Sequence, residues 1–375
     1  MKKNIQSVNV IFHGTKVGTL SMGDKSCCMF EYSKDWLRDG FSISPLHLPL
    51  KTGVFVADYM PFKGNFGVFE DSVPGGYGEY MLQKMLAKHG VDYKSLTPVQ
   101  RLSIVGCSGM GALCYVPETK VTEDNKPAKL DDMQQMALQV LSEHTDEYAG
   151  LLYSYSGNSG GARPKGLYSD ESGHWLVKFR HIYDPINIGE IEYQYNLAAQ
   201  NCGIDVPDFK LLEGKYFAVR RFDIDNGERL HVATASALLN EPITPPKMDY
   251  HSLLQLTGYL TQSPDAVEQQ FRRMAFNVYA KNYDDHARNF SFIWRDGHWM
   301  LAPAYDLTND NTLGQHATTV NYNGLPTDED LLVVGTNIRM SRQRCMQIID
   351  EVKPVAEKLL ATVFLNCGCK VTKKN

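Results

Sequence analysis

The segment spanning residues 281–310, KNYDDHARNFSFIWRDGHWMLAPAYDLTND, constrains this chain more than any other stretch. Four residues separate Asp284 from Asn289, which gives a D-x-x-x-x-N pattern. A short strand, a turn and a second strand are expected next, and then Asp306 stands among apolar residues. Phosphoryl transfer needs these three functional groups. One carboxylate orients the attacking hydroxyl, while an amide and a second carboxylate hold Mg²⁺ against the nucleotide phosphates.

Composition limits the class of protein. The 375 residues predict two or three substructures, and 43% apolar with 22% charged residues is ordinary for a globular chain. The net charge of −5 argues against a large nucleic-acid-binding face but leaves room for a DNA-binding partner. The pattern shows no signal peptide and no apolar run of membrane-spanning length. The eight cysteines lack zinc-site spacings, so we expect a cytoplasmic, reducing setting without membrane contact.

The order of predicted elements divides the chain in three. Residues 1–120 read as a mixed α/β subdomain, residues 121–248 as strands with helices, and residues 249–375 as mainly helical. The predicted strands cover residues 8–12, 16–20, 29–32, 102–105, 112–116, 165–169, 175–180, 209–213 and 216–221. The predicted helices cover residues 76–89, 131–144, 189–201, 251–261, 266–283 and 341–364. An α+β fold with two lobes around a nucleotide site fits this order.

The glycine-rich stretch SGNSGGARPK, residues 156–165, precedes a predicted strand. Its glycines allow the backbone to approach phosphates, and Arg163 and Lys165 add positive charge. It is not a Walker A motif, because no G-K-[ST] follows, and an ordinary surface turn is the better explanation when the stretch is taken alone. The glycines at 106–111 also resemble a nucleotide-binding turn, but their order is not G-x-G-x-x-G, so we expect a hairpin turn there.

Lys178 lies in the apolar predicted strand WLVKF. A lysine that faces a core needs an anionic partner, and Glu192 on the following helix is a candidate. A strand lysine paired with a helix glutamate, holding nucleotide phosphates, is the protein-kinase arrangement. An edge-strand lysine in water is the competing interpretation.

Asp284 and Asp285 are expected at the C-terminus of a long helix, where acids oppose the helix dipole and so suggest a functional reason. His286 is either a catalytic base or a histidine that organises the loop. The apolar neighbours of Asp306 indicate a desolvated carboxylate that a divalent cation would keep ionised, although a turn or N-cap aspartate competes with this interpretation. Asp310 could serve the same role.

Ten short motifs, spread over nearly the whole chain, resemble in sequence and in order those of the HipA family of serine/threonine kinase toxins. In the second part they are GGARPK (160–165), LVKF (176–179), EYQYNLAAQNCGIDVPDF (192–209), VRRFD (219–223), NYDDHARNFSF (282–292) and LAPAYDL (301–307). In the first part they are GTKVGTL (14–20), FEYSKDWL (30–37), SPLHLPL (44–50) and GMGALCYVPE (109–118).

The resemblance implies a bilobal, eukaryotic-protein-kinase-like fold that uses ATP and Mg²⁺, with an N-terminal mixed α/β subdomain and a mainly α-helical C-terminal lobe. Asp284 would be the catalytic base, and Lys178 would hold the α and β phosphates. Asn289 and Asp306 would bind Mg²⁺. The other nucleotide-binding residues would be Gly160, Gly161 and Lys165 over the phosphates, Arg220 and Phe222 in the adenine hinge, and Asp223 near the ribose.

The resemblance also implies partners and regulation. Family members work beside a small helix-turn-helix antitoxin, HipB-like, which binds operator DNA, so DNA contact would be indirect. Their protein substrates are aminoacyl-tRNA synthetases, whose phosphorylation halts translation and leads to growth arrest and persistence. The family autophosphorylates a serine of the glycine loop. Asn158 stands at that position here, so Ser159 and then Ser156 are the candidates. Arg220 replaces a hinge glutamate, but hinge contacts to adenine are mainly backbone contacts, so ATP binding should survive.

Two other functions fit part of the pattern. One is a kinase of a small molecule or lipid head group, because fold does not fix substrate. The other is a non-catalytic, ATP-binding co-repressor scaffold for an antitoxin. The presence of Lys178, Asp284, Asn289 and Asp306 together favours catalysis, because burying these polar groups without a purpose is costly.

Overall fold

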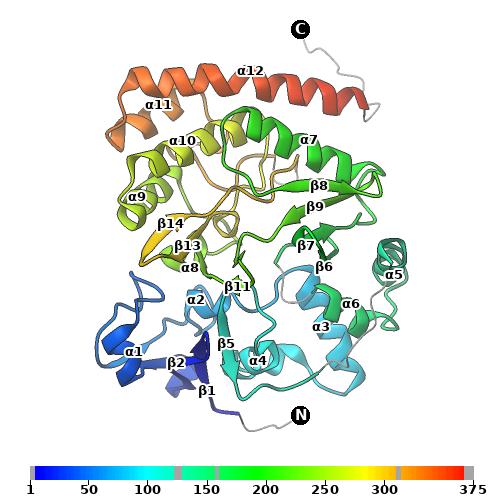
Figure 1. The fold of residues 1–375 in the computed structure, drawn as a ribbon, viewed down its shortest axis with the longest axis vertical. Helices are drawn as coiled ribbons and strands as arrows, with labels where there is room; N and C mark the ends of the chain where they lie inside the picture. Colours follow the sequence, from blue (N-terminus) through cyan, green and yellow to red (C-terminus); the bar gives the residue numbers. More distant parts are fainter. Residues whose placement is uncertain (1–4, 122–128, 157–159, 310–313, 367–375) are drawn as a thin grey trace. The chain divides into compact units, whose positions relative to one another are not determined.

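The computed structural model describes residues 5–121, 129–156, 160–309 and 314–366. The chain forms two units, each described here by itself: Met1–Asp184 with Asp223–Asn240, and Pro185–Phe222 with Glu241–Asn375. Figure 1 shows the elements in chain order. The division at residues 120 and 248 stays a prediction, since the two units follow other boundaries.

An antiparallel five-stranded sheet opens the first unit, in the order β4-β3-β2-β1-β5. His13 and Gly14 have φ of 44° and 77°, the left-handed values that a tight two-residue hairpin requires. The predicted hairpin and the third strand are therefore confirmed. The strands are β1 Ser7–Phe12, β2 Thr15–Met22, β3 Cys28–Tyr32, β4 Val54–Val56 and β5 Leu113–Val116.

Helix α4 (Pro98–Val105) replaces the predicted strand at 102–105, so that prediction was wrong. The Thr97 side chain accepts a hydrogen bond from the Gln100 N–H, and the Gln100 side chain accepts one from the Thr97 N–H. This capping box, with Pro98 at the first helical position, starts a helix that the short apolar run alone does not reveal.

A helical core completes much of the first unit. Helix α3 (Tyr77–Lys88) packs on α6 (Ala149–Ser156), and α6 contacts α5 (Leu130–Glu143). Their buried side chains form one apolar cluster, to which α3 gives Met81, Leu82 and Met85 and α6 gives Leu152. The helices predicted at 76–89 and 131–144 are confirmed, whereas α6 was not expected. The other helices here are α1 Lys34–Asp39, α2 Gly67–Glu70 and α8 Ala235–Leu239.

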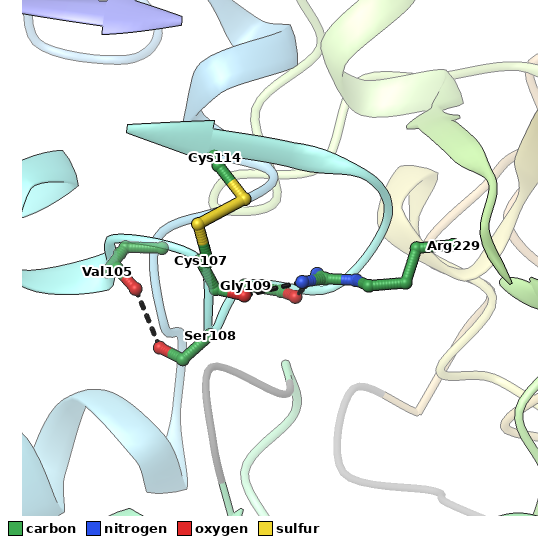
Figure 2. Close-up of a disulfide and its surroundings, with 6 residues drawn as sticks. All are labelled: Val105, Cys107, Ser108, Gly109, Cys114 and Arg229. Carbon is green, nitrogen blue, oxygen red and sulfur yellow. Dashed lines mark hydrogen bonds between the residues drawn. A yellow bond between two sulfur atoms is a disulfide. The ribbon is translucent and has the colours of Figure 1, made fainter. Parts of the chain in front are cut away.

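The glycine turn between α4 and β5 is closed by a disulfide between Cys107 and Cys114 (Figure 2). The Arg229 guanidinium donates hydrogen bonds to the carbonyl oxygens of Cys107 and Gly109. This turn joins a helix to a strand, so the predicted hairpin is corrected. The cysteine spacing had suggested reduced thiols, and it gave no signal for this pair.

The rest of the first unit comes from two separate stretches of the chain. Strands β6 (Lys165–Asp170) and β7 (Gly173–Lys178) confirm the two strands predicted there, and they pair as an antiparallel hairpin. After residue 222 the chain returns with β10 Ile224–Asp225, β11 Glu228–Arg229 and β12 His231–Thr234. Thr234 donates from its N–H and its hydroxyl to the Asp71 carboxylate, at 2.8 Å each, which fastens this return to the earlier part.

The second unit is mainly helical. Helix α10 (Pro264–Tyr279) packs against α9 (Tyr250–Thr261) and the long α12 (Arg342–Asn366), and α12 also contacts α7 (Ile188–Asn201), as Figure 1 shows. Helix α11 (Asp328–Asn337) precedes α12. The antiparallel pairs are β8 Phe209–Leu212 with β9 Tyr216–Arg220, and β13 Ser291–Arg295 with β14 His298–Leu301. No helix among the described residues is long and apolar enough to span a bilayer.

Candidate active site

The loop that carries Asp284 begins after α10 has ended. The helix stops at Tyr279, and Lys281 takes a left-handed φ of 55°. The interpretation that Asp284 and Asp285 end the helix was therefore wrong, and the dipole argument does not apply to them. The two acids lie in irregular backbone before a single 3-10 turn, Ala287–Asn289.

Asn289 closes this loop onto Asp284. Its side-chain Nδ2 donates to the Asp284 carbonyl oxygen at 2.7 Å, and its backbone N–H donates to the His286 carbonyl oxygen at 2.8 Å. The Asp284 side chain keeps 36% of its surface exposed. The D-x-x-x-x-N spacing thus has a structural basis, since it fixes the backbone of Asp284 while its carboxylate stays accessible.

His286 lies beside both acids of the predicted chemistry. Its Nε2 is 3.7 Å from an oxygen of Asp284. Burial lowers the pKa of His286, and the nearby Asp306 carboxylate opposes that shift only in part. Both the loop-organising role and the catalytic role of His286 stay predictions.

Asp306 has a φ of 56°, in the left-handed region that few residues other than glycine, asparagine and aspartate adopt. The preceding residue anchors it: the Tyr305 hydroxyl donates to the Arg288 carbonyl oxygen at 2.6 Å and lies 2.5 Å from the Ser291 hydroxyl. The segment after β14 is thereby tied to the loop of Asn289.

An Mg²⁺ ion fits the chemistry of Asn289 and Asp306. The amide nitrogen of Asn289 is taken by the Asp284 carbonyl, which leaves the amide oxygen as a hard donor. Over the described residues, no group of three or more His, Cys, Asp or Glu side chains could hold a metal by itself. One amide and one carboxylate suit an ion that keeps water and phosphate ligands, as Mg²⁺ does. Asp310 lies outside the described residues.

Lys165 and Lys178 face each other across the β6–β7 hairpin of the first unit. They are direct partners in the strand register, so their side chains lie on the same face of the sheet. They are only 7% and 9% exposed. This pairing places two ammonium-bearing side chains next to each other on one face of the hairpin. The pairing of Lys178 with Glu192, a buried residue of α7 in the second unit, stays a prediction.

The glycine loop is described from Gly160 onward. The Gly160 carbonyl oxygen accepts from the Lys165 ammonium, and the Gly161 carbonyl oxygen accepts from the Tyr77 N–H at 3.0 Å. Gly161 has a φ of 87°, in the left-handed region that favours glycine. Arg163 is bound by Asp184 through both carboxylate oxygens, at 3.0 and 3.1 Å.

The two autophosphorylation candidates differ in what the structure says of them. Ser159 lies outside the described residues. Ser156 is fully buried at the end of α6, and its hydroxyl donates to the Tyr153 carbonyl oxygen at 3.3 Å. The Ser156 hydroxyl is therefore not exposed in this structure, and the choice between the two serines stays a prediction.

The predicted hinge residues have separate surroundings. Arg220 directs its guanidinium to Asp208 at 3.0 Å, so its side chain is engaged within the second unit. The Phe222 ring lies 5.4 Å from that of Tyr305, next to Asp306. Asp223 is 2% exposed, and its carboxylate accepts from the Gly111 N–H at 2.9 Å. This contact indicates support for the disulfide-closed turn, and a ribose contact stays a prediction.

Comparison with protein families resolves the identity at the level of family. The model of the HipA N-terminal domain matches residues 8–116, and that of the HipA-like C-terminal domain matches residues 157–359, more than half of the chain. The chain belongs to the HipA family. The resemblance inferred from the motifs is therefore confirmed.

Two relatives of this HipA-family chain are informative. A Sinorhizobium fredii protein described as "Putative kinase Y4dM" is 23% identical over 328 residues, covering 80% of this chain and 76% of that protein. The HipA chain of a Shewanella oneidensis HipA, HipB and operator DNA complex has a TM-score of 0.72 and 18% identity, covering 96% of this chain and 91% of its own. The second likeness confirms a mixed α/β fold with antiparallel sheets, while the bilobal protein-kinase arrangement stays a prediction.

Several residues around the candidate site were not assigned a role from the sequence. Tyr305 was visible only as part of an apolar run, and its role depends on a hydroxyl that reaches Arg288 across a turn. Asp285 was set aside in favour of Asp284, yet it is the more deeply buried acid. His316 lies beyond the motif, and nothing in its neighbours marks it.

Proposed function

We propose that this chain is an ATP- and Mg²⁺-dependent serine/threonine protein kinase of the HipA type, resident in the cytoplasm. The observation that carries the proposal is the geometry of the Asp284 loop. Asn289 Nδ2 bonds the Asp284 carbonyl oxygen at 2.7 Å, while the Asp284 carboxylate stays accessible. His286 of the same loop lies close enough to Asp306 for its pKa to be affected by that carboxylate. A base, an amide oxygen and a second carboxylate are the groups that kinase chemistry uses.

Each residue has a stated task in the proposed reaction. Asp284 accepts the proton of the substrate hydroxyl as that oxygen bonds to the γ-phosphorus and the bond to the β–γ bridging oxygen breaks, which releases ADP. Asn289 and Asp306 would hold Mg²⁺, which when bound neutralises charge on the phosphates. Lys165 and Lys178 would bind phosphate oxygens from the first unit.

Membership of the family also suggests a biological role. We propose that the chain is the toxin of a toxin–antitoxin pair and that it phosphorylates a translation component such as an aminoacyl-tRNA synthetase, which leads to growth arrest. Its partner would be a small helix-turn-helix antitoxin, HipB-like, through which it would meet DNA indirectly. The Shewanella oneidensis complex supports this partner by likeness of fold.

The first test replaces Asp284 or Asp306 by asparagine. Asp306→Asn keeps a residue that tolerates the left-handed backbone, so it removes charge with little strain. We expect transfer of the γ-phosphoryl group of ATP to fall at least about a hundredfold in either variant. Asp296→Asn is the matched control, because Asp296 is an exposed acid with a φ of 52° in the turn between β13 and β14.

Expression without a partner and phosphoproteomics complete the test. Growth arrest that needs Asp284, together with new phosphate on serine or threonine of a translation protein, is the expected outcome. Undiminished phosphoryl transfer by Asp284→Asn would refute the mechanism. Activity confined to small molecules or lipids would refute the protein substrate.

A further inference from the structure

Asp285 lies at the centre of a buried hydrogen-bond cluster in the second unit. It is 1% exposed. One carboxylate oxygen lies 3.0 Å from the Tyr250 hydroxyl and 3.0 Å from His316 Nδ1, and the other accepts from the Thr318 N–H at 3.1 Å. Because a carboxylate can only accept, the hydroxyl and the imidazole nitrogen must both donate to it.

The same residues join two distant segments of the chain. The Thr318 hydroxyl donates to the Asp285 carbonyl oxygen, and the Ala317 N–H donates to the Tyr283 carbonyl oxygen at 3.0 Å. The Tyr283 and His316 rings meet edge to face, with centroids 4.8 Å apart. Residues 283–285 and 316–318 are thus bound through backbone, side chain and ring.

The residues assigned to the proposed reaction lie in the first of these two segments or in the chain between them. Asp284 belongs to the first segment, and the chain between the segments carries Asn289 and Asp306. Asp285 thus stands at the start of that stretch, and its carboxylate is hydrogen-bonded to His316 and Thr318 at the other end. A change in the hydrogen bonds at this point would shift both flanks of the stretch together.

Helices α9 and α10 also make hydrogen bonds to the residues of this cluster and its neighbours. Asn277 of α10 donates from Nδ2 to the Tyr250 hydroxyl at 2.9 Å, and the Tyr250 N–H at the start of α9 donates to the Thr319 carbonyl oxygen at 2.9 Å. Burial raises the pKa of Tyr250 well above its usual value, and the Asp285 charge adds to this, so the hydroxyl stays protonated as a donor.

We propose that Tyr250, Asp285 and His316 form a positioning cluster that sets the Asp284 loop and the Asp306 segment in register for phosphoryl transfer. This inference rests on the proposed function. The hydrogen bonds of the cluster given above all join residues of the second unit, whereas the lysines assigned to the nucleotide phosphates belong to the first unit. Loss of the cluster should therefore lower kcat and leave the KM for ATP nearly unchanged.

The experiment measures ADP release from Mg-ATP by the full chain. Tyr250→Phe removes one of the three donors to Asp285, and Asp285→Asn replaces the acceptor. Thr257→Val is the matched control, because it removes one buried hydroxyl from the same helix, where it bonds only the Leu253 carbonyl oxygen among the contacts described. We expect kcat to fall about tenfold in Tyr250→Phe and about a hundredfold in Asp285→Asn, with the KM for ATP within about twofold.

Hydrogen exchange supplies a readout that does not depend on activity. The amides of Ala317 and Thr318 should exchange faster in both cluster variants, while Thr257→Val leaves them as in the wild type. A kcat within about twofold of the wild type in Tyr250→Phe, with the Asp284→Asn variant inactive, would overturn the positioning role alone. A wild-type chain that does not turn over ATP would overturn the proposed function, and the positioning role with it.

Discussion

Asp284 and Asp285 are adjacent in the chain, but their carboxylates meet different surroundings. Asp284 keeps much of its side chain in contact with solvent, whereas Asp285 is enclosed by donors from Tyr250, His316 and Thr318. A buried carboxylate is stable only when it is hydrogen-bonded, and those bonds fix its position. In the proposed reaction the same functional group would therefore serve as a reachable base at one residue and as a fixed support at the next.

At the same scale, His231 predicts acid sensitivity of the first unit. It is fully buried beside Ile43, whose carbonyl oxygen lies 2.8 Å from Nε2, and burial lowers its pKa from 6.5 to about 4. Between these values the unfolded chain binds a proton that the folded chain does not, so the free energy of unfolding falls as the pH falls from about 6.5 to about 4.

At pH 4.5 the proton uptake of His231 should lower the free energy of unfolding by about 2 to 3 kcal/mol. Urea unfolding of the wild type and of His231→Gln at pH 7 and at pH 4.5 measures it. Glutamine can still donate to Ile43 but does not titrate, so the variant should lose less stability on acidification. Equal losses in both proteins would contradict the assignment.

At the scale of elements, the turn between α4 and β5 combines a covalent link with hydrogen bonds from the returning chain. The disulfide joins cysteines seven residues apart, and Arg229 and Asp223 bind three backbone groups of the same turn. Reduction of the disulfide therefore affects a turn that also binds Asp223, the residue directly after the predicted hinge.

We predict that reduction of this disulfide lowers the free energy of unfolding of the first unit by about 2 to 3 kcal/mol, the loop-closure value for so short a loop. Thermal unfolding with and without dithiothreitol measures the change. The double variant Cys107→Ser, Cys114→Ser should not respond to the reductant. A wild type that unfolds at the same temperature in both buffers would argue against the link.

The sequence predicted elements best where one periodic pattern ran without interruption. The hairpin around His13, the helix α3 and the long α12 follow from such patterns. Helix α4 was missed because its evidence is a cap, Thr97 with Gln100, and not its apolar residues. The site residues of the family could be proposed from the D-x-x-x-x-N spacing, whereas His316 and Tyr305 could not, because their roles arise only from contacts between segments distant in sequence.

At the scale of the whole molecule, the first unit takes its residues from both sides of an insertion. Residues 185–222 belong to the second unit, and the chain then returns for residues 223–240. The returning stretch supplies Arg229 to the disulfide-closed turn and Thr234 to the Asp71 carboxylate. Neither unit is therefore a continuous piece of sequence.

We predict that a fragment of residues 1–184 lacks the cooperative unfolding transition of the first unit, because the bonds to Arg229, His231 and Thr234 are missing from it. Near-ultraviolet circular dichroism during urea titration compares this fragment with the full chain. A fragment that unfolds at the urea concentration of the full chain's first unit would show that residues 223–240 are dispensable.

The interrupted order of the first unit also has a consequence for synthesis. A ribosome delivers the chain from the N-terminus, and domains generally fold as units once their residues have emerged. The first unit cannot close until residue 240 has left the exit tunnel, by which time part of the second unit is already outside. The nascent chain must therefore carry two incomplete units at once: the residues of the α3–α6 cluster are already outside, while the stretch that completes the first unit is still to come.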